Sequence, residues 1–99
     1  MRLLVTPTFE RVAKKLNPQQ KVSLDEAVRV IAAVPATGEF KVGDLKGIQV
    51  YKFKMGNQQC LLAYRQLSRE VIKLLMVGPH ENFYRSLKRI DNWTQIPRT

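Results

Sequence analysis

The chain has 99 residues, 44% of them hydrophobic, and carries 17 Lys or Arg against 8 Asp or Glu, a formal net charge of +9 at pH 7. This length and apolar content predict a single globular domain over residues 1–99 and argue against a disordered chain. No apolar run approaches the roughly 18 residues of a membrane-spanning helix, and one cysteine excludes an internal disulfide, so we expect a cytoplasmic protein.

The positive charge is concentrated in the second half of the chain. Nine basic and three acidic residues follow Gln49. A basic field of this size favours a polyanionic partner, which is a nucleic acid, an anionic membrane or an acidic protein. A basic but merely solvated surface is the plainer interpretation, because net charge bears on association and not on fold.

The first third of the sequence predicts a strand followed by two helices. The apolar run "RLLV" ends at Thr6-Pro7, an N-cap residue with proline at the first helical position. A second start signal follows at Asn17-Pro18, where Gln20 completes a capping box, and Pro35 ends this helix. Apolar residues recur at helical spacing in both segments: Phe9, Val12, Ala13 and Leu16, then Leu24, Ala27, Val28, Ile31 and Val34.

The middle of the sequence predicts a three-stranded antiparallel meander. Tyr51, Phe53 and Met55 alternate with Lys52 and Lys54 in "IQVYKFKM", as expected of a strand. Short turns connect this strand to "QQCLLAYRQL" and then to "VIKLLMVG", which are apolar on both sides and therefore central, with helices on one face. The Gly-rich segment "GEFKVGDLKG" before the meander is either a loop or a short edge strand. Cys60, inside the second strand, is expected to be a buried structural thiol.

A short helix is predicted after Gly78-Pro79. Phe83, Leu87 and Ile90 have the spacing of a buried stripe. His80, the only histidine, lies four residues before Tyr84, so both side chains are expected on one face of this helix. The fold class predicted from the whole sequence is α+β, with an N-terminal strand, two helices, the meander and a short C-terminal helix.

Cationic and phenolic side chains remain as candidate site residues once other kinds of site are set aside. The sequence has no cluster of metal ligands, no nucleophile elbow and no phosphate-binding Gly-Lys-Ser/Thr loop, so we expect no metal and no cofactor. The remaining groups suit metal-free phosphodiester chemistry, in which cations hold a phosphate while an imidazole and a phenol move protons or stack on a base. The candidates are Lys52, Lys54, Arg65, His80, Tyr84, Arg85 and Lys88.

Each of these residues also has a purely structural interpretation. The histidine suits a capping role and the tyrosine suits half-buried packing. The two lysines of the first meander strand suit a solvated strand face, and Arg65 suits an ion pair with Glu70 across the next turn. Taken together they favour a site, because a meander brings cations from three distant segments to one side.

The order of elements resembles the RelE/ParE superfamily of bacterial type II toxins. The resemblance covers residues 1–90, and its most specific segments are "GDLKGIQVYKFK", "LLAYR" and "VGPHENFYRSLKR". The Gly, His-Glu and Tyr-Arg spacing of the last segment is most similar to the HigB- and RelE-type branches.

The resemblance implies a ribosome-dependent endoribonuclease that cuts messenger RNA by metal-free attack of the ribose 2′-hydroxyl and so inhibits translation. The catalytic residues are then His80 for proton transfer, Tyr84 for stacking or activation, and Lys52 and Lys54 at the scissile region. RNA and phosphate binding falls to Arg65, Arg85 and Lys88. Arg65 matches less well, because RelE has its middle-strand arginine several residues earlier, at the position of Gln59, Cys60 and Leu61 here.

The alternative from another class is a ParE-type inhibitor of DNA gyrase without nuclease activity. Both interpretations imply a cognate antitoxin that neutralises the basic surface. The first also implies the ribosome and messenger RNA as partners. No membrane partner is expected, and contact with DNA is expected only indirectly through the antitoxin.

Overall fold

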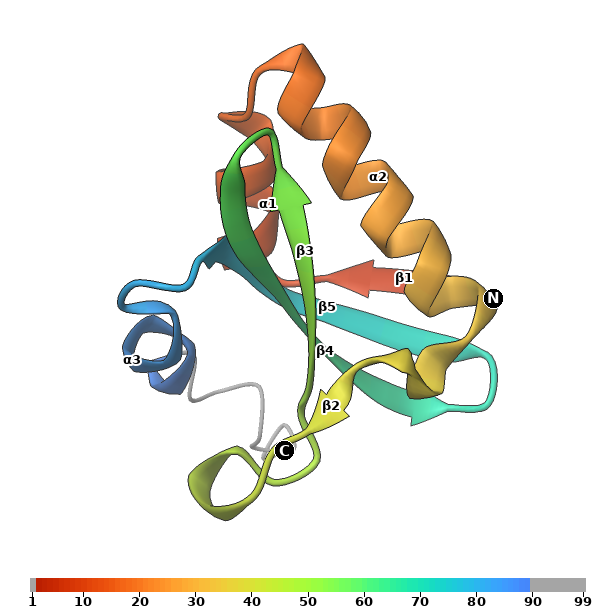
Figure 1. Cartoon of the computed structure of the whole chain (residues 1–99). Coiled ribbons are helices and arrows are strands. Elements are labelled where there is room, and N and C mark those ends of the chain that lie inside the picture. The colour runs from red at the N-terminus through yellow and green to blue at the C-terminus, as the bar shows by residue number, and fades with distance from the viewer. Residues whose placement is uncertain (1, 90–99) are drawn as a thin grey trace.

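The computed structural model describes residues 2–89 and has the α+β architecture that the sequence predicts (Figure 1). Ile90, expected on the buried stripe of the last helix, lies outside the described residues, as does the tail that follows it. In chain order the elements are β1 (Arg2–Val5), α1 (Pro7–Lys14), α2 (Pro18–Ala33), the 3-10 turn η1 (Pro35–Thr37), β2 (Glu39–Phe40), the 3-10 turn η2 (Gly43–Leu45), β3 (Gln49–Met55), β4 (Gln58–Ser68), β5 (Val71–Pro79) and α3 (Phe83–Lys88).

The five strands form one sheet in the order β1-β5-β4-β3-β2. The antiparallel meander β3-β4-β5 is confirmed, with β4 at its centre. Strand β1 pairs in parallel with β5, starting at Arg2 opposite Val71. The segment before the meander contains an edge strand, because Glu39 and Phe40 pair with Val50 and Gln49 of β3.

Local signals at the helix starts act as the sequence predicts. The Thr6 hydroxyl accepts a hydrogen bond from the Phe9 amide at 3.0 Å and donates one to the Leu75 carbonyl at 2.7 Å, so this cap also ties α1 to β5. Asn17 and Gln20 form the capping box, with bonds of 2.9 and 2.8 Å. Helix α2 stops at Ala33, two residues before Pro35.

Helices α1 and α2 cover one face of the sheet. Their buried residues pack against the inward side chains of the three meander strands, which alternate along each strand as the pleat requires. This cluster contains Phe9, Leu24, Ala27, Ile31, Met55, Cys60, Leu62, Tyr64, Ile72, Leu74 and Val77.

The opposite face is covered by α3 and by the segment around η2, a cover that the sequence analysis did not predict. Phe83 and Leu87 of α3 are buried on this face against Leu61, Ala63 and neighbouring residues of the meander. Leu45 and Ile48 complete the cluster. The central strands are therefore apolar on both sides, because both faces of the sheet are buried under other elements.

A buried polar network fixes the connection between α2 and β2. The Tyr64 hydroxyl donates to the Pro35 carbonyl at 2.5 Å and accepts from the Gly38 amide at 2.8 Å. The Gln49 amide donates to the Pro35 and Gly38 carbonyls at 2.8 and 3.1 Å. Gly38 is required here, because a Cβ at this position would lie 2.6 Å from the Tyr64 hydroxyl oxygen.

Replacing Tyr64 with Phe is expected to lower the free energy of unfolding by about 1–3 kcal/mol, since the Gly38 amide and the Pro35 carbonyl lose a partner in a buried setting. Urea denaturation of the purified variant measures this. Tyr51→Phe is the matched control, because Tyr51 is only half-buried, and it should cost clearly less. Equal effects of the two substitutions would contradict the role of the Tyr64 hydroxyl.

Candidate active site

His80 and Tyr84 lie together, although not on one helix as the spacing predicted. Helix α3 begins only at Phe83, and His80 belongs to the turn before it, where the Phe83 amide donates to the His80 carbonyl at 3.1 Å. Asn82 has φ of 62°, a left-handed conformation that asparagine tolerates better than most residues. The two rings still meet edge to face, with centroids 6.0 Å apart and planes at 80°.

Lys41, which the sequence analysis did not single out, contacts the candidate site. Its ammonium lies 5.5 Å from the centroid of the Tyr84 ring and 3.2 Å from a carboxylate oxygen of Glu39. Partial burial disfavours its charged form, but hydrogen bonding and charge interaction with Glu39 and Tyr84 prevail and raise the pKa of Lys41 above its ordinary value. The ammonium therefore stays protonated at neutral pH. No local pattern in "GEFKVGDLKG" marks this lysine, because it meets Tyr84 only through the fold.

Lys52 and Lys54 are exposed on β3, where the alternation places them on the face that carries α3. Lys52 pairs with Leu61, which pairs in turn with Gly78, two residues before His80. Two strand spacings, about 10 Å, therefore separate the backbones of Lys52 and Gly78. Lys54 is farther along β3, near the hairpin turn, and also lines a hollow of about 350 Å³ beside α2.

Gly78 has no side chain to fill the space between Lys52 and the turn that carries His80. Gly78 is buried, but an ideal Cβ built on it would meet no heavy atom of residues 2–89 within 4 Å. Because Gly78 pairs with Leu61, that space is on the α3 side of the sheet, between the level of Lys52 and the start of the His80 turn.

The three predicted phosphate-binding residues are divided between two places. Arg65 lies on β4, five residues after Cys60, which pairs with Pro79 of β5. Its guanidinium packs against Gly47: the guanidinium carbon would lie 3.7 Å from a Cβ built on that glycine. Five strand residues span roughly 16 Å, so the register puts Arg65 well along β4 from the His80 end of the sheet. Arg85 and Lys88 are exposed on α3, close in sequence to Tyr84.

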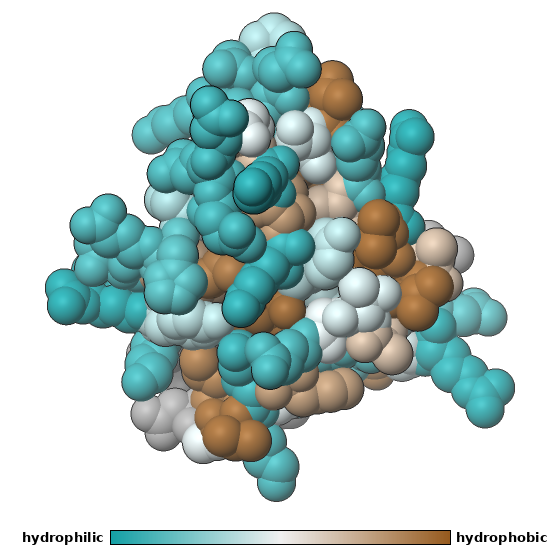
Figure 2. All heavy atoms as spheres, in the orientation of Figure 1, coloured by the Kyte–Doolittle hydropathy of each residue, from teal (hydrophilic) through white to brown (hydrophobic). Residues whose placement is uncertain are grey.

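The surface of the molecule mixes hydrophilic side chains with exposed apolar ones. Figure 2 shows hydrophilic groups projecting around the periphery and across the front, with hydrophobic groups between them and at the lower end, where β2 and η2 lie in Figure 1. Phe40 and Val42, which flank Lys41, are 60% and 84% exposed. Lys41 is thus flanked in the sequence by two apolar side chains that face water.

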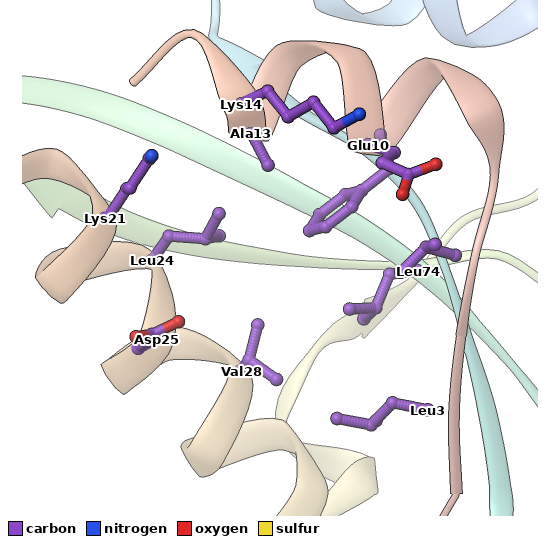
Figure 3. A pocket seen from close by; sticks show the side chains of 11 residues that line it. Leu3, Glu10, Ala13, Lys14, Lys21, Leu24, Asp25, Val28 and Leu74 are labelled. Carbon is purple, nitrogen blue, oxygen red and sulfur yellow. The ribbon is translucent and has the colours of Figure 1, made fainter. Parts of the chain in front are cut away.

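A separate hollow of about 490 Å³ lies on the opposite face, between α1, α2 and the β1 edge (Figure 3). Its floor is apolar, with Leu3, Phe9 and Leu74 among its residues, and Lys14 and Asp25 are among the charged residues at its rim. It contains none of the predicted site residues. Within residues 2–89 no group of three or more His, Cys, Asp or Glu side chains is placed to hold a metal ion, and no helix there is long and apolar enough to cross a membrane.

Cys60 is the buried structural thiol that we expected, at 2% exposure. Burial raises the pKa of this thiol, because it disfavours the thiolate, and a backbone hydrogen bond from Met55 only partly offsets the effect.

We expect the native protein to react with iodoacetamide at pH 8 much more slowly than the urea-unfolded chain, as measured by mass spectrometry. Equal labelling rates in the two states would contradict this.

Comparison with known proteins identifies the family. A family model described as the ParE-like toxin of type II bacterial toxin-antitoxin systems matches residues 3–88. No curated protein matches the chain. Among solved structures, the chain is similar to a free E. coli RelE toxin with two arginine-to-alanine substitutions (17% identity, TM-score 0.69, 90% of this chain and 96% of that one).

Two further similar structures are complexes. One is the RelE of the intact E. coli RelBE toxin-antitoxin complex (18% identity, TM-score 0.64, 81% of this chain and 96% of that one). The other is from the archaeal RelE-RelB complex of Pyrococcus horikoshii (15% identity, TM-score 0.51, 81% and 94%). Identities this low establish a shared fold only. With the family match spanning nearly all of the described residues, the chain belongs to the ParE-like toxins of type II bacterial toxin-antitoxin systems.

Proposed function

We propose that this toxin is a ribosome-dependent endoribonuclease that cuts messenger RNA without a metal ion and thereby inhibits translation. The observation that carries the proposal is the contact between the rings of His80 and Tyr84 on the α3 face of the sheet. An imidazole and a phenol next to each other can act as the proton donor and acceptor of a phosphodiester cleavage. The fold shared with RelE toxins supports the same reaction class.

The chemistry assigns a role to each group. Attack of the ribose 2′-oxygen on the adjacent phosphorus yields a 2′,3′-cyclic phosphate and a 5′-hydroxyl. His80 protonates the leaving 5′-oxygen, and Tyr84 stacks on a base and receives the proton of the 2′-hydroxyl. Lys52, Lys54 and Arg85 neutralise phosphates, and Lys88 extends the basic surface along α3. Arg65 is proposed to bind RNA away from the scissile bond, as its place along β4 favours.

The open floor at Gly78 supports this arrangement. A ribose-phosphate unit needs space between the cation that holds it and the groups that move its protons. The missing side chain at Gly78 leaves room on the α3 side, level with Lys52 and next to the His80 turn.

A second candidate function is inhibition of DNA gyrase, favoured by the ParE-like description of the family. In that case the basic α3 face would contact a protein or DNA, and the His80–Tyr84 pair would have no chemical task. Induction in growing cells distinguishes the two, because an endoribonuclease arrests translation whereas a gyrase inhibitor raises DNA-damage signalling first.

A cognate antitoxin is the proposed physiological partner. The RelE proteins in two of the similar structures are in complexes with RelB antitoxins. A chain with a net charge of +9 suits an acidic partner segment that covers its basic groups. Any contact with DNA would then pass through that antitoxin.

Replacing His80 with Ala or Tyr84 with Phe is expected to remove toxicity and to slow in-frame messenger RNA cleavage at least about a hundredfold, because each change removes a proton-transfer group. Mapping RNA 5′ ends after induction measures the cleavage. Lys21→Met, an exposed residue of α2 on the other face, is the control and should remain toxic. Variants of His80 and Tyr84 that cleave as the wild type does would refute the assignment.

Replacing Gly78 with Val should leave the free energy of unfolding nearly unchanged, since the new side chain enters open space in a strand that favours β-branched residues. Cleavage of ribosome-bound RNA should fall at least about tenfold, because the valine occupies the room proposed for the ribose-phosphate. Thermal unfolding and a cleavage assay measure the two quantities. Full cleavage by a stable variant would show that substrate does not use this space.

A further inference from the structure

Lys41 contacts the Tyr84 ring from an element far away in the sequence. It follows β2, and its backbone amide donates to the Ile48 carbonyl at 2.9 Å. Glu39 and Lys41 are two residues apart and therefore share one side of this extended segment. The Lys41 ammonium lies between the Glu39 carboxylate, 3.2 Å away, and the Tyr84 ring. Glu39 is largely exposed, so this ion pair adds little to stability.

The backbone that precedes Lys41 is held by a buried hydrogen-bond network, whereas the helix that carries Tyr84 is held by apolar packing. The buried Tyr64 and Gln49 side chains hydrogen-bond to the carbonyls of Pro35 and Gly38 and to the Gly38 amide, directly before β2 begins. Helix α3, by contrast, has six residues and is anchored by Phe83 and Leu87. A cation fixed to the sheet and set against an aromatic ring restricts how that ring turns.

We propose that Lys41 is a positioning residue for RNA cleavage, which holds the Tyr84 phenol in place and stabilises negative charge on its oxygen. This role rests on the proposed function. In the step concerned, a Tyr84 phenolate takes the proton of the ribose 2′-hydroxyl while the 2′-oxygen bonds to phosphorus. The bond from phosphorus to the 5′-oxygen breaks, and a His80 imidazolium gives that oxygen its proton. Exchange with water then restores the phenolate and the imidazolium.

A double-mutant cycle tests whether Lys41 acts through Tyr84. Single-turnover cleavage of ribosome-bound messenger RNA is measured for Lys41→Met, Lys41→Arg, Tyr84→Phe and the Lys41→Met/Tyr84→Phe pair, with Lys21→Met as the charge-matched control. We expect Lys41→Met to slow cleavage roughly 10- to 100-fold and Lys41→Arg to recover most of the rate. In the Tyr84→Phe background, Lys41→Met should change the rate less than about twofold.

Two outcomes of the cycle overturn the proposal while leaving the proposed function intact. One is cleavage by Lys41→Met at the rate of Lys21→Met. The other is an undiminished effect of Lys41→Met in the Tyr84→Phe background together with weaker RNA binding, which would make Lys41 a phosphate contact. A wild-type protein that cleaves no RNA would refute the proposed function itself and this role with it.

An RNA-free measurement keeps the test decisive if Tyr84→Phe is inactive. With ¹³C-labelled tyrosine, we expect the Tyr84 ring resonances to shift in Lys41→Met and to stay in place in Lys21→Met. Unchanged Tyr84 resonances in Lys41→Met would overturn the positioning role whatever the cleavage rates are.

Discussion

Burial of strand β4 on both faces is the constraint on which the rest of the structure depends. Leu61, Leu62, Ala63 and Tyr64 are consecutive, and each has no exposed surface. Because successive side chains of a strand point to opposite faces, a run of this kind requires a separate cover on each side of the sheet. Helices α1 and α2 supply one cover, and α3 with the η2 segment supplies the other.

The two covers differ in size, and the candidate site lies beside the smaller one. Helix α2 has 16 residues, whereas α3 has six and reaches the sheet through Phe83 and Leu87. A short cover leaves the sheet face exposed to solvent at Lys52, whereas Gly78 is buried. The irregular pairing between Ala63 and Tyr64 leaves Leu75 as an extra residue on β5, so that Leu75 and Met76 both lie on the α3 face, while Leu74 and Val77 face α1 and α2.

The fold and the function depend on different side chains. The RelE structures share this fold at 15 to 18% identity, so the shared architecture does not require most of the residues of this chain. The reaction proposed for this chain depends on a few exposed or half-buried groups that contribute little to the core. Lys41 shows how the two are linked, since buried Tyr64 and Gln49 hold the backbone that brings its ammonium to Tyr84.

Local signals in the sequence determined most of the secondary structure. The caps at Thr6 and Asn17, the stop at Pro35 and the alternation in β3 act within a few residues, and the structure confirms each of them. The covering of the second sheet face by α3 was not predicted, because apolar residues on both sides of a strand do not say which element covers which side.

The site was only partly predictable, since its geometry depends on pairings distant in sequence. His80 and Tyr84 were expected to be neighbours, but through helical spacing, and they meet instead across a turn that Asn82 forms with a left-handed backbone. The amino-acid sequence alone thus determined which chemical groups this protein has and which strands and helices carry them. The tertiary structure decided which groups touch, because the β2–β3 pairing and the docking of α3 bring Lys41 to Tyr84 from more than 40 residues away.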